Sequence, residues 1–151
     1  MKKPIWHSPS KGSALEQFVS YSAGRDVRSI PEADSILIPY DIWTNQAHAI
    51  GLHHLGLYNE DELERVLRAL ESLLKKWEQG EWQLDPSLED VHINIESFIT
   101  EQCGELIGGR LHSGRSRNDQ VACDMKLYAR DVLLSFMKES IALVDAILER
   151  A

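Results

Sequence analysis

The sequence is poor in cysteine and contains no long apolar run. Only two of its 151 residues are cysteine, Cys103 and Cys123, and neither has the CxxC or Cys/His spacing of a metal site. Reduced thiols in a cytoplasmic protein are therefore expected. The basic start, Met1-Lys2-Lys3, has no apolar run behind it, and nowhere do about eighteen apolar residues run together. These absences argue against both secretion and a membrane-spanning helix.

An excess of positive charge is also absent. The chain has 16 Lys and Arg residues against 24 Asp and Glu residues, a formal net charge of -8. Because a phosphate backbone or an anionic membrane would meet net repulsion, we expect no nucleic-acid and no membrane partner. The 43% of hydrophobic and 26% of charged residues are typical of a globular protein, and the length suits one domain with one sizeable core.

No segment shows sustained alternation of apolar and polar residues, so β-strands are not expected. Residues 63–77 instead place apolar side chains at the three-and-four spacing of one helix face. Asn59 with Glu62 forms a capping box before this helix, and Gly80 is its expected stop. A second amphipathic helix, with apolar positions from Val91 to Leu106, is expected to end at Gly104 or at Gly108-Gly109. These patterns predict an all-α fold.

The first third of the chain is less regular. Residues 1–30 contain several prolines and glycines and are expected to form an irregular arm with one short helix. Residues 31–57 are rich in apolar residues, and Pro39 is placed to kink or restart a helix there. The side of this helix expected to be buried carries Ile42, Trp43, Ala47, Ile50 and Leu55.

The last segment predicts one very long helix. From about Asn118 to Ala151 apolar residues recur at helical spacing without any proline or glycine. About thirty residues span about 45 Å, and such a stripe needs partners along its whole length. We expect that the chain oligomerises through this helix, that it is the front part of a longer polypeptide, or both. The expected organisation is a helical domain over residues 1–115, including the arm, leading into the truncated start of an oligomeric multi-helix bundle over residues 116–151.

A basic, glycine-rich segment precedes the long helix, and we call residues 108–120 the anion loop. It concentrates three arginines, two serines, an asparagine and three glycines in an otherwise acidic chain. Unpaired N–H groups at a helix N-terminus, hydroxyl and amide donors, and guanidinium groups together suit a carboxylate or a phosphate. The alternative is an N-cap at Ser116, Asn118 or Asp119 with exposed arginines that pair with acidic residues. The GxxxxGK[ST] spacing of a Walker loop is absent.

A second polar group lies near the start of the helix that begins at about Val91. His92 and Glu96 are four residues apart and share a helix face. HxxxE alone is a weak metal signal, and the alternative is a solvated first turn in which the histidine bonds a neighbouring carboxylate. His48, His53 and His54 have spacings that are poor for one ion, so they are expected to be ordinary surface or core histidines.

Two of these segments together carry a resemblance to a known family. EDVHINIE, followed by GGRLHSGRSRNDQVACDMKLYARD, resembles the EDxHxxxE and KxHxGRSRNDQ segments of the argininosuccinate lyases in the fumarase/aspartase superfamily. The match extends more weakly to PYDIWTNQAHAIGLHHLGL, which is similar to the family's D-x-x-x-S-x-A-H helix. The resemblance implies a mainly helical N-terminal domain, a central bundle of long helices, a homotetramer, and active sites formed where segments of three subunits meet.

The resemblance also implies an activity and residue roles. The family cleaves argininosuccinate to arginine and fumarate by β-elimination, with no metal and no organic cofactor. The implied substrate-binding residues are Ser116 and Asn118 for the carboxylates, Arg117 for charge or loop position, His92 lining the site, and Ser22 with Asp26 for the arginine end. The family's THxQ and GSSxMPxKxNP segments, which carry the acid/base histidine and the catalytic serine, have no counterpart here. No catalytic residue is therefore expected in this chain, and alone it should bind poorly and not turn over.

A different class of function stays open at this point. The chain could be a non-catalytic, lyase-like binding or interaction module that uses the anion loop without chemistry. A helical DNA-binding protein that reads sequence through Arg115 and Arg117 is disfavoured by the overall acidity and by the absence of a short helix-turn-helix pattern.

Overall fold

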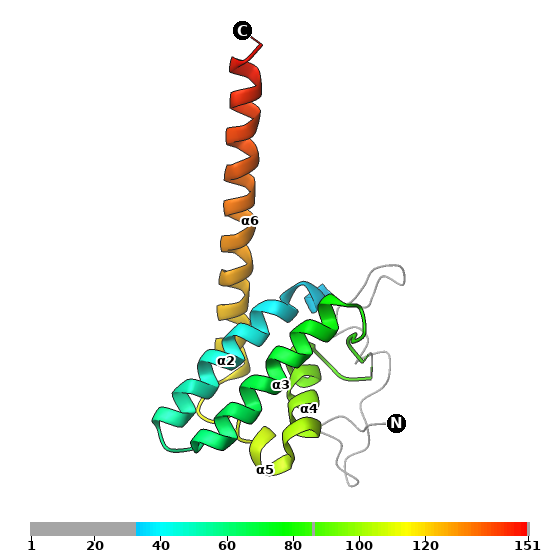
Figure 1. The fold of residues 1–151 in the computed structure, drawn as a ribbon, viewed down its shortest axis with the longest axis vertical. Helices are drawn as coiled ribbons and strands as arrows, with labels where there is room; N and C mark the ends of the chain where they lie inside the picture. Colours follow the sequence, from blue (N-terminus) through cyan, green and yellow to red (C-terminus); the bar gives the residue numbers. More distant parts are fainter. Residues whose placement is uncertain (1–32, 86, 151) are drawn as a thin grey trace.

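The computed structural model describes residues 33–85 and 87–150. Every element in these ranges is a helix, which confirms the all-α fold (Figure 1). In chain order they are η1 (Ala33–Leu37), α2 (Ile38–His54), α3 (Glu60–Glu78), α4 (Val91–Cys103), α5 (Glu105–Gly108) and α6 (Arg117–Leu148). The arm predicted over residues 1–30 lies outside the described residues.

Helix α3 has the boundaries that its sequence predicts. The side chain of Asn59 accepts a hydrogen bond from the backbone N–H of Glu62 at 2.9 Å, and Glu62 accepts one from the N–H of Asn59 at 3.0 Å. This reciprocal pair satisfies two backbone donors that a helix start leaves open. At the other end, Gly80 has a φ of +74°, a conformation that favours glycine, just beyond the C-cap residue Gln79.

The hydrophobic core lies among α2, α3 and α4, where α3 buries Val66, Leu70 and Leu73. Apolar residues of α2 and α4 pack against this stripe, and α5 closes the lower end (Figure 1). Tyr58, in the turn between α2 and α3, is also buried and donates its hydroxyl to the carbonyl of Ile107 at 2.7 Å. A buried Tyr hydroxyl without a partner would be unfavourable, so this bond ties the turn to α5.

The predicted buried face of α2 is mostly wrong. Ile42 is fully buried, but Trp43 is 52% exposed, and Ala47, Ile50 and Leu55 are also exposed. The helix instead turns a mixed face inward, which consists of Ile38, Asp41, Ile42, Asn45, Ala49 and Leu52. Hydrophobicity alone selected the wrong side because Asp41 and Asn45 find polar partners inside the fold. Pro39 lies in the first turn of α2, directly after η1, which confirms that it restarts a helix.

Helix α4 ends at Cys103, and Gly104 has a φ of +88°, as the first of the two predicted stops requires. The short α5 then packs closely on α4, because a Cβ at Gly108 would lie 2.5 Å from the Thr100 Cα. Leu106 was expected to be buried, but it is 84% exposed. The break at Gly104 rotates α5, so the register of α4 does not continue to residue 106.

Helix α6 spans 32 residues, which corresponds to about 48 Å. Its first turns lie against α2, and its remainder projects away from the other helices (Figure 1). Gln120 and Asp124 are its buried residues, and Tyr128 packs partly against the core. The apolar positions beyond Tyr128 are exposed, and they include Val132, Phe136, Met137, Ile141, Val144 and Leu148. None of the described helices combines the length and apolarity that a membrane span requires.

Candidate functional site

The anion loop leads into α6 through a capped helix start. Ser116 is the N-cap, and its hydroxyl oxygen accepts a hydrogen bond from the backbone N–H of Asn118 at 3.2 Å. Asp119 in turn accepts a hydrogen bond from the N–H of Ser116 at 3.1 Å. The N-cap interpretation is therefore confirmed for Ser116. Its hydroxyl proton is still available to donate, and both Ser116 and Asn118 are exposed at the positive end of the helix dipole.

The loop is held against α2. Gly114 has a φ of +75°, which an L side chain rarely adopts, and it reverses the chain just before the helix begins. A ring nitrogen of His48, Nε2, lies 2.9 Å from the carbonyl oxygen of Ser113. Burial, followed by the nearby Arg115, lowers the pKa of His48. A neutral His48 can donate from Nε2, so this contact anchors the loop near neutral pH.

One of the three loop arginines is structural. Arg110 donates from Nε to the carbonyl of Leu106 at 2.8 Å and from Nη1 to that of Leu57 at 2.6 Å. Its Nη2 pairs with Glu62, and its guanidinium lies 5.1 Å from the Tyr58 ring centroid. These contacts engage all three nitrogens of the guanidinium, so Arg110 joins α3, α5 and the turn between α2 and α3.

Arg117 lies beside the start of α4, where its Nη1 is 3.3 Å from Asp90 Oδ1. Asp90 is the N-cap of α4 and also accepts a hydrogen bond from the N–H of Ile93 at 2.7 Å. Arg117 therefore joins the starts of α4 and α6. Arg115 is half-buried and donates to the side-chain oxygen of Asn45 on α2. The prediction that arginines pair with acidic residues holds for Arg110 and Arg117, whereas Arg115 takes an amide.

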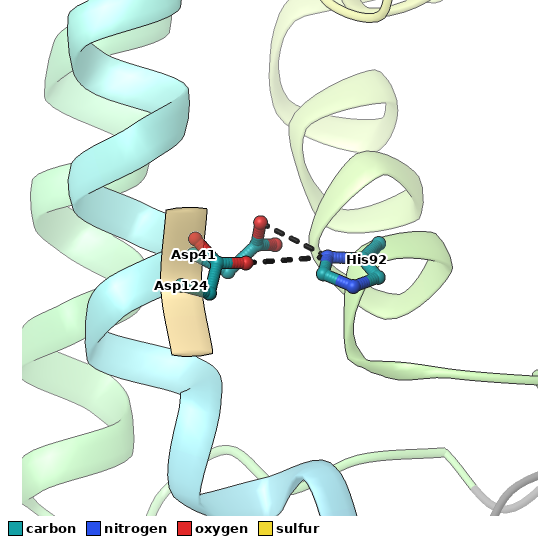
Figure 2. Close-up of side chains that lie close together, drawn as sticks. All are labelled: Asp41, His92 and Asp124. Atoms are coloured by element: carbon teal, nitrogen blue, oxygen red, sulfur yellow. Dashed lines mark ion pairs between the residues drawn. The ribbon is translucent and has the colours of Figure 1, made fainter. Parts of the chain in front are cut away.

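A cluster of ionisable side chains lies beneath this loop, and we call Asp41, His92 and Asp124 the buried triad. Figure 2 shows the His92 ring turned toward the two carboxylates, which come from α2 and α6. Nδ1 of His92 is 3.0 Å from Oδ1 of Asp41 and 3.7 Å from Oδ2 of Asp124. His92 is 4% exposed and both aspartates are 0% exposed. The triad is thus an interior ion-pair cluster that joins three helices.

Two neutral side chains complete the cluster. Thr44 donates its hydroxyl to Oδ1 of Asp124 at 2.5 Å, and Gln120 donates its amide to Oδ1 of Asp41 at 2.5 Å. The Oδ2 atoms of both aspartates and Nδ1 of His92 make no well-aligned hydrogen bond. The contact between Asp41 and His92 is therefore held mainly by charge. Buried carboxylates of this kind are strongly unfavourable unless cations face them.

The protonation of the triad follows from its surroundings. Burial alone lowers the pKa of His92, but the close carboxylate of Asp41, together with the charge of Asp90, outweighs burial and raises it above the usual value. Burial raises the pKa of Asp124, and the charge of Asp41 raises it further. The triad therefore favours a charged imidazole and opposes full ionisation of the two carboxyl groups.

The triad also has the donor types of a cation site, since one ligand atom from each residue lies within 4.8 Å of the other two. However, Nδ1 of His92 already faces the Asp41 carboxylate at 3.0 Å. The guanidinium of the half-buried Arg115 brings a further positive charge near Asp41 and Asp124. We therefore assign no metal to these residues.

Four of the six predicted substrate-binding residues lie at the starts of two helices that contact each other through Arg117 and Asp90. Ser116 is the N-cap of α6, Arg117 and Asn118 are its first two residues, and His92 is the second residue of α4. The alternative interpretation of His92 holds in part: its turn is not solvated, because the side chain is 4% exposed, but the ring does pair with a carboxylate, that of Asp41. Ser22 and Asp26 lie outside the described residues. A small cavity adjoins this region and is lined by Asn45, His92, Glu96, Leu111, His112, Arg115 and Gln120.

Sequence reasoning missed the residues of the cluster that lie on α2 and α6. Asp41 and Thr44 lie within an apolar stretch of α2, and Gln120 and Asp124 are four residues apart on the same face of α6. Polar residues at helical spacing within an apolar segment are a usable signal of an interior polar contact. No prediction was drawn from this signal, because nothing local shows that the two helices cross there.

Residues 26–151 match the family model described as Lyase. An argininosuccinate lyase of Campylobacter jejuni subsp. doylei is 35% identical over 151 residues, all of this chain and 32% of that protein. The argininosuccinate lyase of Stenotrophomonas maltophilia is 38% identical over 97% of the chain and 33% of that protein. That of Thermus thermophilus is 40% identical over 78% of the chain and 25% of that protein. The chain thus spans about a third of the length of such relatives or less.

Proposed function

The chain belongs to the lyase family, and we propose that it forms the N-terminal part of an argininosuccinate lyase. The proposed reaction breaks the C–N bond of argininosuccinate and removes a proton from the neighbouring carbon, which yields arginine and fumarate. The observation that carries this proposal is the capped start of α6, where exposed Ser116 and Asn118 lie beside Arg117 and close to His92. The alternative of a non-catalytic module is not favoured, because the relatives aligned with the whole chain are named as enzymes.

The roles proposed for these residues follow from their chemistry. Ser116 can donate its hydroxyl proton and Asn118 its amide to a carboxylate, and the dipole of α6 favours negative charge at the same place. Arg117 supplies a guanidinium that is only partly neutralised by Asp90 at 3.3 Å. Such donors stabilise the negative charge that develops when a proton is removed beside a carboxylate. We propose Ser22 and Asp26 for the arginine end of the substrate by resemblance alone.

The proposed assembly is a homotetramer in which α6 belongs to a multi-helix bundle. Its apolar positions beyond Tyr128 are exposed, and Phe136 alone is 66% exposed. A stripe of this length is buried in stable proteins by other helices. We propose that residues 1–115 form a helical domain and that residues 116–151 begin the multi-helix bundle. A cytoplasmic location is part of the same proposal, since Cys103 and Cys123 are both free thiols.

The sharpest test is a chimera, because the chain aligns over its full length with the Campylobacter jejuni relative. The chain replaces the matching segment of that relative, and fumarate release from argininosuccinate is followed by ultraviolet absorbance. We expect the chimera to be active and its Asn118→Ala variant to lose about a hundredfold or more in kcat/KM, the loss typical of a removed oxyanion donor.

Two controls accompany the chimera. The chain by itself is expected to release no fumarate. Glu78→Gln, which changes an exposed carboxylate at the end of α3, is expected to leave the kinetics unchanged. A folded chimera without activity, or an Asn118→Ala variant as active as its parent, would contradict the proposed function.

A further inference from the structure

The buried triad is the feature that the proposed function does not yet use. Its three residues come from different helices, Asp41 from α2, His92 from α4 and Asp124 from α6. Each is at least nine-tenths buried, so none of them is exposed enough to be a simple surface charge. A buried ion pair is weak evidence for stability, and in some proteins such a pair instead fixes a specific arrangement of helices.

The triad lies directly beneath the groups proposed to bind substrate. His92 follows Asp90 by two residues, and Asp90 holds Arg117 at the start of α6. Gln120 is in the first turn of α6 and donates to Asp41 at 2.5 Å. The triad is therefore joined to the start of α6 through two short links, one through Asp90 and Arg117 and one through Asp41 and Gln120.

Charge balance explains why both aspartates are present. Charged and titratable groups from every neighbouring element face His92. The acidic groups are Asp34 from η1, Asp41 from α2, Asp90 and Glu96 from α4 and its N-cap, and Asp124 from α6. The basic groups are His112 and Arg115 from the loop and Arg117 from α6. Among the residues that the structure describes, the carboxylates of Asp41 and Asp124 pair with its Nδ1. Arg117 opposes a charged imidazole, so the two aspartates supply the negative charge toward which Nδ1 points.

We propose that Asp41 and Asp124 are positioning residues of the substrate site: they hold the His92 ring with Nδ1 directed into the protein and thereby fix the starts of α4 and α6 relative to each other. The inference rests on the proposed function, because the groups so fixed are those proposed to bind the carboxylates. Neither aspartate contacts substrate in this scheme.

The first test uses the intact chain and needs no substrate. Histidine-selective NMR follows the titration of His92, and backbone amide spectra follow residues 112–118, in the parent chain and in Asp41→Asn. We expect the His92 midpoint to fall by about one pH unit or more when the facing charge is removed, and the loop amides to shift. Asp131→Asn is the matched control, because Asp131 also joins α6 to α2, through Tyr40 at 3.1 Å, but without contact to His92.

Asp124→Asn keeps the test decisive if Asp41→Asn does not fold, as judged by helical circular dichroism. Unchanged His92 midpoints and loop amides in a folded variant would overturn the inference. A change of equal size in Asp131→Asn would overturn it too, since any α2–α6 contact would then have the same effect. Displacement of the His92 resonances by stoichiometric Zn²⁺ would also overturn it, because the triad would then be a cation site.

The second test places Asp41→Asn in the chimera. We expect kcat/KM to fall by about ten- to a hundredfold, as misplacement of positioned groups typically causes, and the alkaline limb of the pH profile to move to lower pH. A merely structural role would leave the pH profile in place. An inactive parent chimera would overturn the proposed function, while the NMR comparison in the chain would still decide the inference about Asp41 and Asp124.

Discussion

At the scale of single residues, the three arginines of the anion loop show how strongly surroundings determine a role. Arg110 has its whole guanidinium engaged by two carbonyls, Glu62 and the Tyr58 ring, and it stabilises the fold. Arg117, seven residues later, touches one carboxylate at 3.3 Å and keeps donors for a ligand. The same residue type therefore serves structure at one position and, in our proposal, substrate binding at the other.

His92 makes the stability of the chain depend on pH. Its folded pKa lies above the unfolded value of 6.5, so it contributes stability that is complete below pH 6.5 and is lost as pH rises through the folded pKa. The raised pKa of Asp124 likewise makes the free energy of unfolding fall as pH rises. His48 and His112 have lowered pKa values and act in the opposite direction, but only below 6.5.

We therefore expect the free energy of unfolding to fall as pH rises above 6.5, by about 1.4 kcal/mol for each pH unit that separates the two pKa values of His92. Urea unfolding at a series of pH values measures this slope. Asp41→Asn should flatten it, whereas Asp131→Asn should not. A free energy of unfolding that stays level or increases over this range would contradict the assignment of His92.

At the scale of elements, local sequence sets where a helix begins or ends, and tertiary contacts set how closely two helices pack. The capping boxes of α3 and α6 and the glycine after α4 act within a few residues. Gly108 differs from these, because it is needed where α5 meets Thr100 of α4, not for its own backbone conformation. A glycine of this kind marks close approach of two helices.

Gly108→Ala should separate α4 from α5, since the new Cβ would lie 2.5 Å from the Cα and Oγ1 of Thr100. We expect a destabilisation of about 1–3 kcal/mol, typical of overpacking against backbone. Gly51→Ala is the matched control, because Gly51 is also helical and its Cβ would meet nothing within 4 Å. That variant should instead gain about 0.5–1 kcal/mol from reduced backbone entropy. Equal effects in the two variants, measured by urea unfolding, would argue against the close approach.

At the scale of the whole molecule, the chain divides into a packed helical body and a projecting helix (Figure 1). The body buries a continuous core, whereas α6 beyond Tyr128 exposes apolar residues on an otherwise charged helix. An exposed stripe of this extent drives association in water.

We expect the chain to self-associate at micromolar concentration. Phe136→Glu combined with Ile141→Glu should weaken association, because both side chains are more than half exposed on α6 and would place charge in the contact. Ser135→Glu, a neighbouring exposed position, is the control for added charge. Sedimentation velocity gives the oligomeric state of each, and a stable monomer of the parent chain would contradict this expectation.

Much of the fold and part of the site could be predicted from the sequence. Both ends of α3, the first of the two stops offered for α4 and the start of α6 depend on caps and glycines that lie beside them, so the sequence predicted them. Ser116, Arg117 and His92 were found because they lie in two short recognisable segments. Asp41 and Asp124 could not be found in this way, because their role depends on contacts such as Thr44 with Asp124, 80 residues apart in the chain. The buried face of α2 was misjudged for the same reason.

The sequence by itself determined that the chain is helical, where α3 starts and stops, where α6 starts, and which family the chain resembles, because these depend on local spacing and short motifs. Only the tertiary structure decided that α2 turns its aspartate inward and that His92 is a buried ion-pair partner. The physical reason is that a buried charge is tolerated only when opposite charges from other helices surround it, and no local pattern specifies how those helices cross.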